Sequence, residues 1–515
     1  MLEPTITDIE SAFKKLSNSP AKDYWNLSNQ IVKLLQNWLR DHLLNLFNLI
    51  LKEETFPDNA KVSVIIPVYK GGSRKDPGNY RPISLLSPLS KLLEILLFQQ
   101  ILSFSEKHSC ISKTHYGGCA AKSTMGPLLE IRDTTLRLAQ EDLRTILVLI
   151  DFSKAFDLID RQLLLNKLNN RGFRGKIGNI LSTYLHGRKQ CVRLGTTTST
   201  LLQTNKGIPQ GSVLSPFLFN LYTSDLHSWL PNITLPQFVD DTSLLVGAPS
   251  LQALEIRTQS VLYRVAEWAQ NNALLINYSK TKYLIMLKKN PSEKLHLRIN
   301  NQQIEEVANA KLLGVTIQNN LHWDIHGEHI KTKLAQILGF FYRSSSLFPL
   351  YVRKAIYFSL FQTYLTYGLP VWGFIGMTQV KNITTIQKRM LMYLAKGNQD
   401  WVQVCKMHKI LPFPKLIIYC RAIIAFRAYY GLTKDVVWEK IQGTKIHSHF
   451  TRQVTNLRVP FVARELYKQT SNVSLSQTWN LIPEPIRLSR NLVVFKLTLK
   501  EWLLQDLEID TVFGS

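Results

Sequence analysis

The sequence predicts an α+β fold, with a small β-sheet within the first 320 residues and a mainly helical region after it. Runs of strand length that are rich in β-branched or apolar residues occur at 62–68 and 145–150, and another pair flanks 240–241. Beyond about residue 324 the apolar spacing is helical, with Lys and Arg on the remaining face. A chain of 515 residues can bury a large core without disulfide bonds.

The chain carries a large positive charge. Lys and Arg together number 62 against 37 for Asp and Glu, which gives a net charge of +25 spread along the sequence. Such an excess favours a polyanionic partner, because Lys and Arg that neutralise phosphates release counterions. On charge alone, a basic protein with no nucleic-acid role remains the alternative.

Cysteine usage and hydropathy predict an intracellular, soluble protein. The five cysteines are scattered, which is typical of free thiols in a reducing compartment. Cys405 and His408 have the spacing of a zinc-binding pair, with His447 and His449 downstream, but no second pair follows at a matching interval. No stretch approaches the roughly 18 apolar residues of a membrane span, and the first residues lack the apolar core of a signal peptide.

The first hundred residues predict helices, one strand and a further helix. Residues 1–60 show helical spacing, and 62–68 predicts a strand followed by a loop with Gly71 and Gly72. Pro88 then opens a helix capped by Ser87. The residues expected on the apolar faces of these helices are Leu34, Leu35, Trp38, Leu39, Leu43, Leu46, Phe47 and Ile50, and then Leu92, Leu93, Leu96 and Leu97.

The central part of the chain predicts the sheet. The run TILVLI at 145–150 is continuously apolar, which predicts a buried central strand that stops at Asp151. The segment LPQFVDDTSLLV places Asp240 and Asp241 at a hairpin turn between two short strands. The other expected elements are a helix from about Asp160, strands at CVRLG and TTTST (191–200), a helix at 251–272, a strand at KLLGVTI (311–317), and helices at 325–346, 350–369 and 380–396.

Three aspartates carry the predicted chemistry. Asp151 and the pair Asp240 and Asp241 all follow expected apolar strands, so they converge if those strands are neighbours. Joining a 3′-hydroxyl to the α-phosphate of a nucleoside triphosphate uses two Mg²⁺ ions, and hard cations prefer carboxylates. The backbone carbonyl of Phe152 could supply a further ligand. A lone aspartate after a strand would instead be a turn former or a helix cap.

Three motifs containing these aspartates resemble those of a known enzyme family. DFSKAFD at 151–157, GIPQGSVLSPFLFNLY at 207–222 and FVDD at 238–241 resemble, in order and spacing, the A, B and C motifs of reverse transcriptase palms. The similarity extends over about residues 45–325. The segments NYRPISLL and PQGSVLSP, together with WNLIPEPIR and FKLTLKEWLL between 479 and 504, look like the jockey-related branch of LINE-type, non-LTR retrotransposons.

The resemblance implies a right-hand polymerase fold. A helical N-terminal extension is expected at 1–47, fingers and a palm with a small antiparallel sheet at 48–320, a helical thumb-like region at 321–430, and a C-terminal region of uncertain fold at 431–515. A full-length element of this kind would carry an endonuclease ahead of the polymerase, and we expect this chain to lack it.

The implied activity is that of an RNA-directed DNA polymerase, which extends a primer 3′-hydroxyl with dNTPs by two-metal catalysis with Mg²⁺, or Mn²⁺ in its place. The implied partners are an RNA template and a DNA primer or target, within a ribonucleoprotein that contains the element RNA, and no membrane. The implied location is the cytoplasm for assembly of that particle and the nucleus for its action.

The resemblance also implies roles for individual residues. The catalytic metal ligands would be Asp151, Phe152, Asp240 and Asp241. Phe156 matches an aromatic residue that excludes the ribose 2′-hydroxyl. Lys280 is the candidate general acid for the leaving pyrophosphate, with Lys282 near enough to compete. The remaining substrate-binding residues are Lys70 and Arg81, expected on the triphosphate, and Gly207, Pro209, Gln210 and Gly211, expected under the incoming base and the template.

One segment departs from the family pattern. In HYGGCAAKST at 115–124, His115, Gly118, Cys119 and Lys122 stand where the family usually has other residues, on a fingers surface expected to face template or nucleotide. This departure motivates one alternative, a catalytically weakened nucleic-acid-binding relic. A second alternative, an RNA-dependent RNA polymerase, is disfavoured by Phe156, because such an enzyme has no need to reject ribonucleotides.

Overall fold

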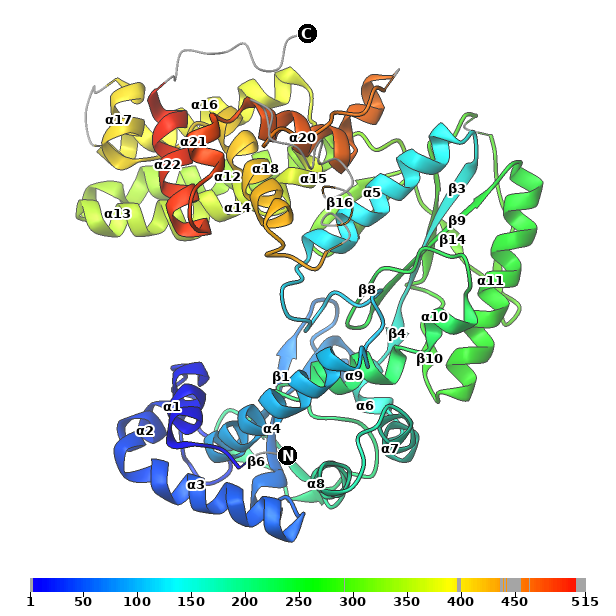
Figure 1. Ribbon diagram of the computed structural model, residues 1–515, viewed down its shortest axis with the longest axis vertical. Helices are drawn as coiled ribbons and strands as arrows, with labels where there is room; N and C mark the ends of the chain where they lie inside the picture. Colours follow the sequence, from blue (N-terminus) through cyan, green and yellow to red (C-terminus); the bar gives the residue numbers. More distant parts are fainter. Residues whose placement is uncertain are drawn as a thin grey trace.

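The fold is α+β, as predicted. The computed structural model describes residues 3–505 except 291, 396–399, 436–438, 440, 442–454 and 463. Helices from residue 324 onward gather in one cluster, coloured yellow to red, while the N-terminal helices lie at the opposite end in blue (Figure 1). Two sheets occupy the region between them. No described helix is long and apolar enough to cross a membrane.

The N-terminal part is helical, with α1 (Ile6–Lys15), α2 (Asn29–Leu34) and α3 (Gln36–Glu53). The expected apolar face is only partly buried: Leu43, Phe47 and Ile50 are buried, but Leu34 is 85% exposed and Trp38 is 66% exposed. The reason is that α2 ends at Leu34 and α3 begins at Gln36, so one helical period does not run through both. Helix α3 also runs across the boundary expected at 47/48.

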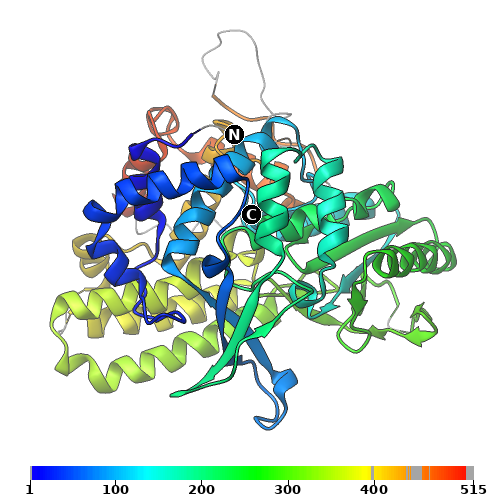
Figure 2. The same ribbon diagram turned by 90° about the horizontal axis from the view of Figure 1, so that it is seen from below.

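The first sheet contains the expected strand β1 (Val62–Tyr69). It pairs antiparallel with β2 (Tyr80–Leu86) and parallel with β5 (Lys189–Leu194), which in turn pairs with β6 (Thr197–Thr198) and β7 (Leu202–Gln203). Its strands project from the body of the molecule in Figure 2. The following helix α4 (Pro88–Lys107) buries the four leucines expected on its apolar face, although Ser87 makes no side-chain capping bond.

The second sheet has the strand order β14-β11-β3-β9-β8. Its centre is the predicted strand β3 (Arg144–Ile150), which pairs antiparallel on both sides with β9 (Asp241–Ala248) and β11 (Lys282–Met286). At the edges, β8 (Gln237–Phe238) is antiparallel, whereas β14 (Glu305–Glu306) is parallel to β11. The expected antiparallel sheet is therefore mixed at one edge.

Alternate residues of β3 belong to two different cores. Ile146 and Val148 pack in the core that contains helix α11 (Leu251–Asn271), whereas Leu147 packs in the core that contains α5 (Met125–Gln140) and the C-terminal helices. Side chains alternate between the faces of a strand, so a strand covered on both faces is apolar throughout. This explains why TILVLI shows no polar alternation.

The run KLLGVTI forms a hairpin, not the single strand expected. Strands β15 (Asn309–Leu312) and β16 (Val315–Gln318) are antiparallel neighbours. Leu313 and Gly314 form the turn, with φ of 46° and 82°. Two-residue hairpin turns favour positive φ at both central positions, and the glycine supplied the only sequence signal for it.

The region after residue 320 is helical, as expected. Helices α12 and α16 match two of the three expected segments, and a π-helical turn at Tyr357–Phe361 interrupts the third. The helices are α12 (Asp324–Ser344), α13 (Leu350–Ile356), α14 (Gln362–Thr366), α15 (Leu369–Trp372), α16 (Met377–Ala395), α17 (Trp401–His408), α18 (Phe413–Tyr429), α20 (Ser471–Leu481), α21 (Glu484–Arg487) and α22 (Leu492–Gln505).

The first 320 residues also contain further short helices and strands. They are β4 (Phe152–Ser153), α6 (Ala155–Leu158), α7 (Arg161–Asn170), α8 (Lys176–Leu185), α9 (Ser215–Thr223), α10 (Leu226–Trp229), β10 (Leu275–Ile276), β12 (Arg298–Ile299) and β13 (Gln302–Gln303). The expected helix from Asp160 is α7, and Asp160 caps it by accepting a hydrogen bond from the backbone N–H of Leu163 at 2.9 Å.

Candidate active site

The three aspartates meet at one end of the second sheet. Strand β3 ends at Ile150, which pairs with Thr242 of β9, so one further step of the register places Asp151 opposite Asp241. Antiparallel partners lie about 4.5–5.5 Å apart at their Cα atoms. Asp240 is the second residue of the two-residue turn between β8 and β9, and Asp241 is the first residue of β9. The predicted convergence of the two strand ends is confirmed.

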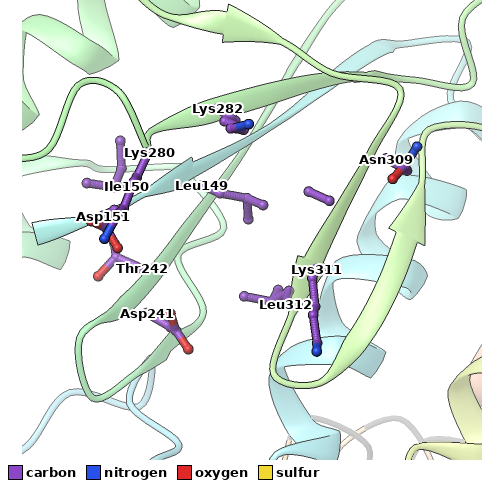
Figure 3. Close-up of a pocket in the computed structure, with 11 residues that line it drawn as sticks. Leu149, Ile150, Asp151, Asp241, Thr242, Lys280, Lys282, Asn309, Lys311 and Leu312 are labelled. Atoms are coloured by element: carbon purple, nitrogen blue, oxygen red, sulfur yellow. The ribbon is translucent and has the colours of Figure 1, made fainter. Parts of the chain in front are cut away.

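Asp151 and Asp241 line a common cleft of about 380 Å³. Figure 3 shows the Lys280 side chain reaching toward Asp151 on one side of this cleft, with Lys311 of the β15–β16 hairpin on the other. Lys282 also lines it. The cleft thus places carboxylates and amines around one space that is open to solvent.

The backbone around Asp151 is held from the neighbouring segment. Its carbonyl accepts a hydrogen bond from the Asn277 backbone N–H at 2.8 Å, and its own N–H donates to the Thr281 hydroxyl at 3.3 Å. The bond from Asn277 makes Phe152 and Ile276 a non-hydrogen-bonded pair, whose carbonyls point away from the partner strand. The Phe152 carbonyl is therefore not used by β10.

The carboxylates repel one another. Burial in the cleft, together with the charges of Asp240 and Asp151, raises the pKa of Asp241 to about 6 against the opposing charge of Arg81. Asp241 remains exposed to solvent, although neighbouring protein atoms partly surround its carboxylate. Burial also raises the pKa of Asp151, with Lys280 opposing that shift and Asp240 reinforcing it. Such mutual repulsion is expected where a cation is to be bound.

The raised pKa of Asp241 predicts a pH-dependent stability. The folded state holds this proton more tightly than the unfolded state does, so ionisation lowers stability as pH rises from about 4 through 6. In EDTA, Asp241→Asn should raise Tm by about 1–2 °C at pH 7.5 and leave Tm unchanged at pH 4. The expected effect at pH 7.5 is small because solvent partly screens the carboxylate. Differential scanning fluorimetry against Asp142→Asn, an exposed aspartate at the other end of β3, checks this. A lower Tm for Asp241→Asn at pH 7.5 would contradict it.

The two expected fingers cations lie on the first sheet, near the aspartates. Lys70 follows β1 and its backbone N–H donates to the Asn79 carbonyl at 2.9 Å, and Arg81 lies on β2 opposite Val68. Both side chains are exposed. The positive charge of Lys70 lowers the pKa of Asp151, and that of Arg81 lowers the pKa of Asp241. The structure therefore brings these cations within electrostatic reach of the carboxylates.

The loop that contains Gln210 lies between the two sheets. The Gln210 side chain donates a hydrogen bond to the Asp157 carboxylate at 3.1 Å. The backbone carbonyl of Gln210 accepts a hydrogen bond from the Ser84 backbone N–H of β2 at 2.8 Å. Pro209 accepts from the Ser215 hydroxyl at 2.8 Å. This segment, Gly207 to Gly211, thus bridges the fingers strand and the palm.

Both glycines of this loop contact protein backbone. A Cβ on Gly207, where φ is 76°, would lie 2.6 Å from the Asp157 carbonyl oxygen. A Cβ on Gly211, where φ is 131°, would lie 2.6 Å from the Ser84 carbonyl oxygen. At both glycines, the close approach that the structure shows is to the backbone of the chain itself.

Phe156 is half-buried beside this loop. Its ring stacks on Phe219 with centroids 4.9 Å apart, and its carbonyl accepts from the Ile208 backbone N–H at 2.9 Å. The residue belongs to α6, directly after the segment that carries Asp151. It therefore has both a packing contact and a place near the predicted substrate site.

The two candidate lysines have different surroundings. Lys282 forms an ion pair with Glu305 at 3.0 Å on the neighbouring strand β14. Lys280 lies close enough to Asp151 for its charge to lower the pKa of that carboxyl. Of the two amines, that of Lys280 is the better placed in the cleft.

Residues that the sequence reasoning missed hold the site together. Asp157 accepts from Gln210, and burial raises the pKa of this carboxyl. Arg161 of α7 donates to the Gly207 carbonyl at 2.9 Å and to the Lys206 carbonyl at 2.9 Å. Asp157 ends the motif DFSKAFD and could have been singled out there, but Arg161 carried no such signal.

The departing segment 115–124 is buried at its start, over His115, Tyr116 and Gly117. His115 is fully buried, and burial lowers the pKa of its imidazole to about 3. Lys122 donates to the carbonyls of Lys113 and His115 at 2.7 Å and 2.6 Å. The expectation that His115 lies on a surface facing template or nucleotide is therefore wrong, because the segment packs beside β8 through a bond from the Tyr116 backbone N–H to the Gln237 carbonyl.

The turn residue Val239 adopts an uncommon conformation. Its φ is 58°, which is costly for a β-branched residue. A Cβ on Gly117 would lie 2.6 Å from the Val239 side chain, so the absence of a side chain at Gly117 makes room for it. The valine is accommodated by a glycine from the departing segment.

The expected alternative of a zinc site finds no support among the described residues. Cys405 is buried on α17, and burial raises the pKa of its thiol to about 12. His408 is the last residue of the same helix. His447 and His449 lie outside the described residues. No group of three His, Cys, Asp or Glu side chains that could hold a metal is found in the part of the chain that the structure describes.

That finding applies also to the three aspartates, which do not form a closed cage. Mg²⁺ is usually bound by one or two carboxylates together with waters and substrate phosphates, not by a cage of protein ligands. The oxygen donors of Asp151 and Asp241 share the cleft, whose lining contains no thiol or imidazole. This donor set fits a hard divalent cation completed by substrate.

Comparisons with known proteins agree with this geometry. Residues 70–317 match the family described as reverse transcriptase (RNA-dependent DNA polymerase). The chain is 26% identical over 402 residues to the probable RNA-directed DNA polymerase from transposon BS of Drosophila melanogaster, covering 75% of this chain and 44% of that protein. It is also 26% identical over 426 residues to the RNA-directed DNA polymerase from mobile element jockey of the same species, covering 80% and 46%.

The chain thus spans less than half the length of these relatives. A further relative, 22% identical over 377 residues, is a putative 115 kDa protein in the type-1 retrotransposable element R1DM of Drosophila melanogaster, covering 71% of this chain and 36% of that protein. The matched family region includes Asp151, Asp240 and Asp241. Residues 70–317 therefore resemble a reverse transcriptase domain, and the chain is similar to RNA-directed DNA polymerases of retrotransposons.

Proposed function

We propose that this chain catalyses RNA-directed DNA synthesis, adding deoxynucleotides to a primer 3′-hydroxyl on an RNA template with release of pyrophosphate. The observation that carries this proposal is the convergence of Asp151, Asp240 and Asp241 at one end of the palm sheet, beside the amine of Lys280. The names of the relatives support the same activity.

Each group in the cleft has a separate task. Lys70 and Arg81 hold the triphosphate by charge-assisted hydrogen bonds. Lys280 donates a proton to the leaving pyrophosphate, since Lys282 is paired with Glu305. The loop of Gly207, Pro209, Gln210 and Gly211 lies under the incoming base and template, with Gln210 oriented by Asp157.

The aspartates hold the divalent cations. Asp151, Asp240, Asp241 and the carbonyl of Phe152 are the residues that would bind Mg²⁺, or Mn²⁺ in its place. Bound there, the ions would stabilise the charge on the attacking and leaving oxygens. The raised pKa of Asp241 supports this assignment, since a bound cation would relieve the repulsion by Asp240 and Asp151 that adds to the effect of burial.

Primer extension tests the function. On poly(rA)/oligo(dT) with dTTP and Mg²⁺, the parent should extend the primer and Asp240→Ala should not. Asp41→Ala, which removes an exposed carboxylate of α3, should extend it as the parent does. A folded parent that binds the template without extending the primer would favour the catalytically weakened relic.

Phe156 should set the choice of sugar. Phe156→Val should reduce discrimination against ribonucleotides by about a hundredfold or more, because the ring that meets the 2′-hydroxyl is removed. The ratio of kcat/KM for dTTP and UTP measures this. Phe219→Leu keeps the Phe156 ring and removes the ring on which it stacks, so it should preserve discrimination. Equal discrimination by Phe156→Val and the parent would contradict the role.

The partners follow from the activity. They are an RNA template, a DNA primer or target and dNTPs, within a ribonucleoprotein that contains the element RNA. The net charge of +25 supports binding to these polyanions. The particle would assemble in the cytoplasm and act in the nucleus, and fractionation of cells that express the tagged chain with its RNA tests this.

The division of the chain also stays a prediction. An N-terminal extension at 1–47, fingers and palm at 48–320, a thumb-like region at 321–430 and a C-terminal region at 431–515 are the expected parts. Limited proteolysis followed by mass spectrometry of the fragments tests these boundaries.

A further inference from the structure

A buried carboxylate from the fingers reaches the loop that contains Gln210. Glu94 lies on α4 and is 0% exposed. Its Oε2 accepts a hydrogen bond from the Ser212 hydroxyl at 2.9 Å and another from the Val213 backbone N–H at 2.8 Å. Its Oε1 accepts from the Tyr184 hydroxyl at 3.1 Å. Three donors therefore converge on the Glu94 side chain. Two of them, Ser212 and Val213, directly follow Gly211 in the chain.

The surroundings of Glu94 supply partners for its charge. Burial raises the pKa of the carboxyl, whereas the charge of Arg188 and the three hydrogen bonds lower it. Arg188 is 3% exposed, donates to the Tyr184 carbonyl at 3.1 Å and lies over the Tyr184 ring. Buried charges persist where they are paired and hydrogen-bonded, so this cluster is built around the carboxylate.

The loop is held at both ends by buried ions from opposite sides. Arg161 of α7 holds the carbonyls of Lys206 and Gly207, and Glu94 of α4 holds Ser212 and Val213. Gln210 lies between these two anchors. A loop fixed at each end can keep its central side chain in one position without a rigid contact at that residue.

The contacts of Gln210 and Gly211 with Ser84 leave the distal end of the loop to the Glu94 anchor. The carbonyl of Gln210 is tied to Ser84, and the close approach of Gly211 to the Ser84 carbonyl leaves no room for the loop to slide along β2. Release of Ser212 and Val213 would free the loop only at its distal end, directly after Gly211. The Gln210 contact with Asp157 is three residues or fewer from that end.

We propose that Glu94 is a positioning residue for the nucleotide site: its carboxylate fixes Ser212 and Val213, and so keeps Gln210 on Asp157 where the incoming nucleotide is bound. The inference rests on the proposed function, because that function gives the Gln210 loop its role. Glu94 lies inside the protein and acts through the loop, not on the substrate.

Glu94→Gln tests this through kinetics on template–primer. The amide keeps the size of the side chain but puts a donor where Ser212, Val213 or Tyr184 donates. We expect kcat/KM for dTTP to fall by about ten- to a hundredfold, mainly through KM, while Kd for template–primer changes by less than about twofold. A loss in template–primer binding as large as that in kcat/KM would overturn the positioning role, as would unchanged kinetics.

Two further variants show whether the effect travels through the loop. Ser90→Ala, one turn earlier on α4, removes a fully buried hydroxyl that has no hydrogen-bond partner in the described part of the chain, and it should leave dTTP kinetics unchanged. Ser212→Ala should reproduce the KM effect more weakly and should be non-additive with Glu94→Gln. Strict additivity would overturn the route through Ser212.

Hydrogen exchange gives a readout that needs no polymerase activity. The amide of Val213 should exchange at least about tenfold faster in Glu94→Gln than in Ser90→Ala, since it loses its acceptor. Unchanged exchange would overturn the anchoring even in an active enzyme. Faster exchange in Glu94→Gln, combined with a parent that does not extend primers, would overturn the proposed function and leave the anchoring intact. If Glu94→Gln does not fold, the same comparisons with Ser212→Ala decide the question.

Discussion

Asp151→Asn should abolish polymerisation without unfolding the protein. The substitution removes one of the carboxylates that line the cleft, and the stabilisation of transition-state charge that depends on it is worth several kcal/mol, or about a thousandfold in kcat. The backbone bonds of Asp151 to Asn277 and Thr281 do not involve the carboxylate, so the strand end stays in place. Single-turnover extension with saturating template–primer measures the loss.

Asp160→Asn is the matched control. Asp160 lies in the same segment, but its carboxylate caps α7, a role that asparagine performs equally well. Asp160→Asn should keep parental kcat.

The stability of Asp151→Asn gives a second check. Because burial and Asp240 raise the pKa of Asp151, the thermal stability of Asp151→Asn should equal or exceed that of the parent at pH 7.5. More than a tenth of parental activity in Asp151→Asn would exclude it as a required metal ligand.

Arg132→Ala should cost about 3–5 kcal/mol of stability, and lower Tm by about 3–5 °C. Arg132 is 1% exposed on α5. Its guanidinium donates to the Asp133 carboxylate at 3.1 Å, to the Pro370 carbonyl at 3.0 Å and to the Ser471 hydroxyl at 3.1 Å. One side chain of the palm thus joins α15 and α20, and its removal leaves a buried carboxylate without that cation.

Arg137→Ala gives the comparison on the same helix. Arg137 is 56% exposed and pairs with Glu141 at 2.9 Å, a surface contact worth about 0.5 kcal/mol or less. Arg132→Lys keeps the charge but cannot reproduce the fork of donors, so it should fall between the two. Urea denaturation of all three variants measures the order. A loss below about 1 kcal/mol in Arg132→Ala would mean that the packing of α15 and α20 does not depend on it.

The parts of the fold that could be predicted are those specified by local pattern. The apolar run before Asp151 and the two short runs around Asp240 and Asp241 each identify a strand and its end, and the register then follows from pairing. The motifs indicated the sheet edge where the three aspartates converge for the same reason. Helices with one apolar face, such as α11, were also recognisable without tertiary information.

The parts that could not be predicted depend on contacts distant in sequence. Glu94 and Arg132 are charged residues on helices, which sequence alone assigns to solvent, yet they are buried because partners more than 100 residues away satisfy them. Leu34 and Trp38 are the opposite case, since apolar residues at helical spacing are exposed where two short helices break the period.

The alternation of β3 between two cores has a consequence for cooperativity. Because Ile146 and Leu147 are adjacent in the chain but pack in different cores, neither core can melt while the strand remains fully ordered. Palm and C-terminal helices should therefore unfold in one calorimetric transition, with van't Hoff and calorimetric enthalpies close to equal. The polymerase edge would inherit the stability of both cores, although Asp151 itself belongs to neither.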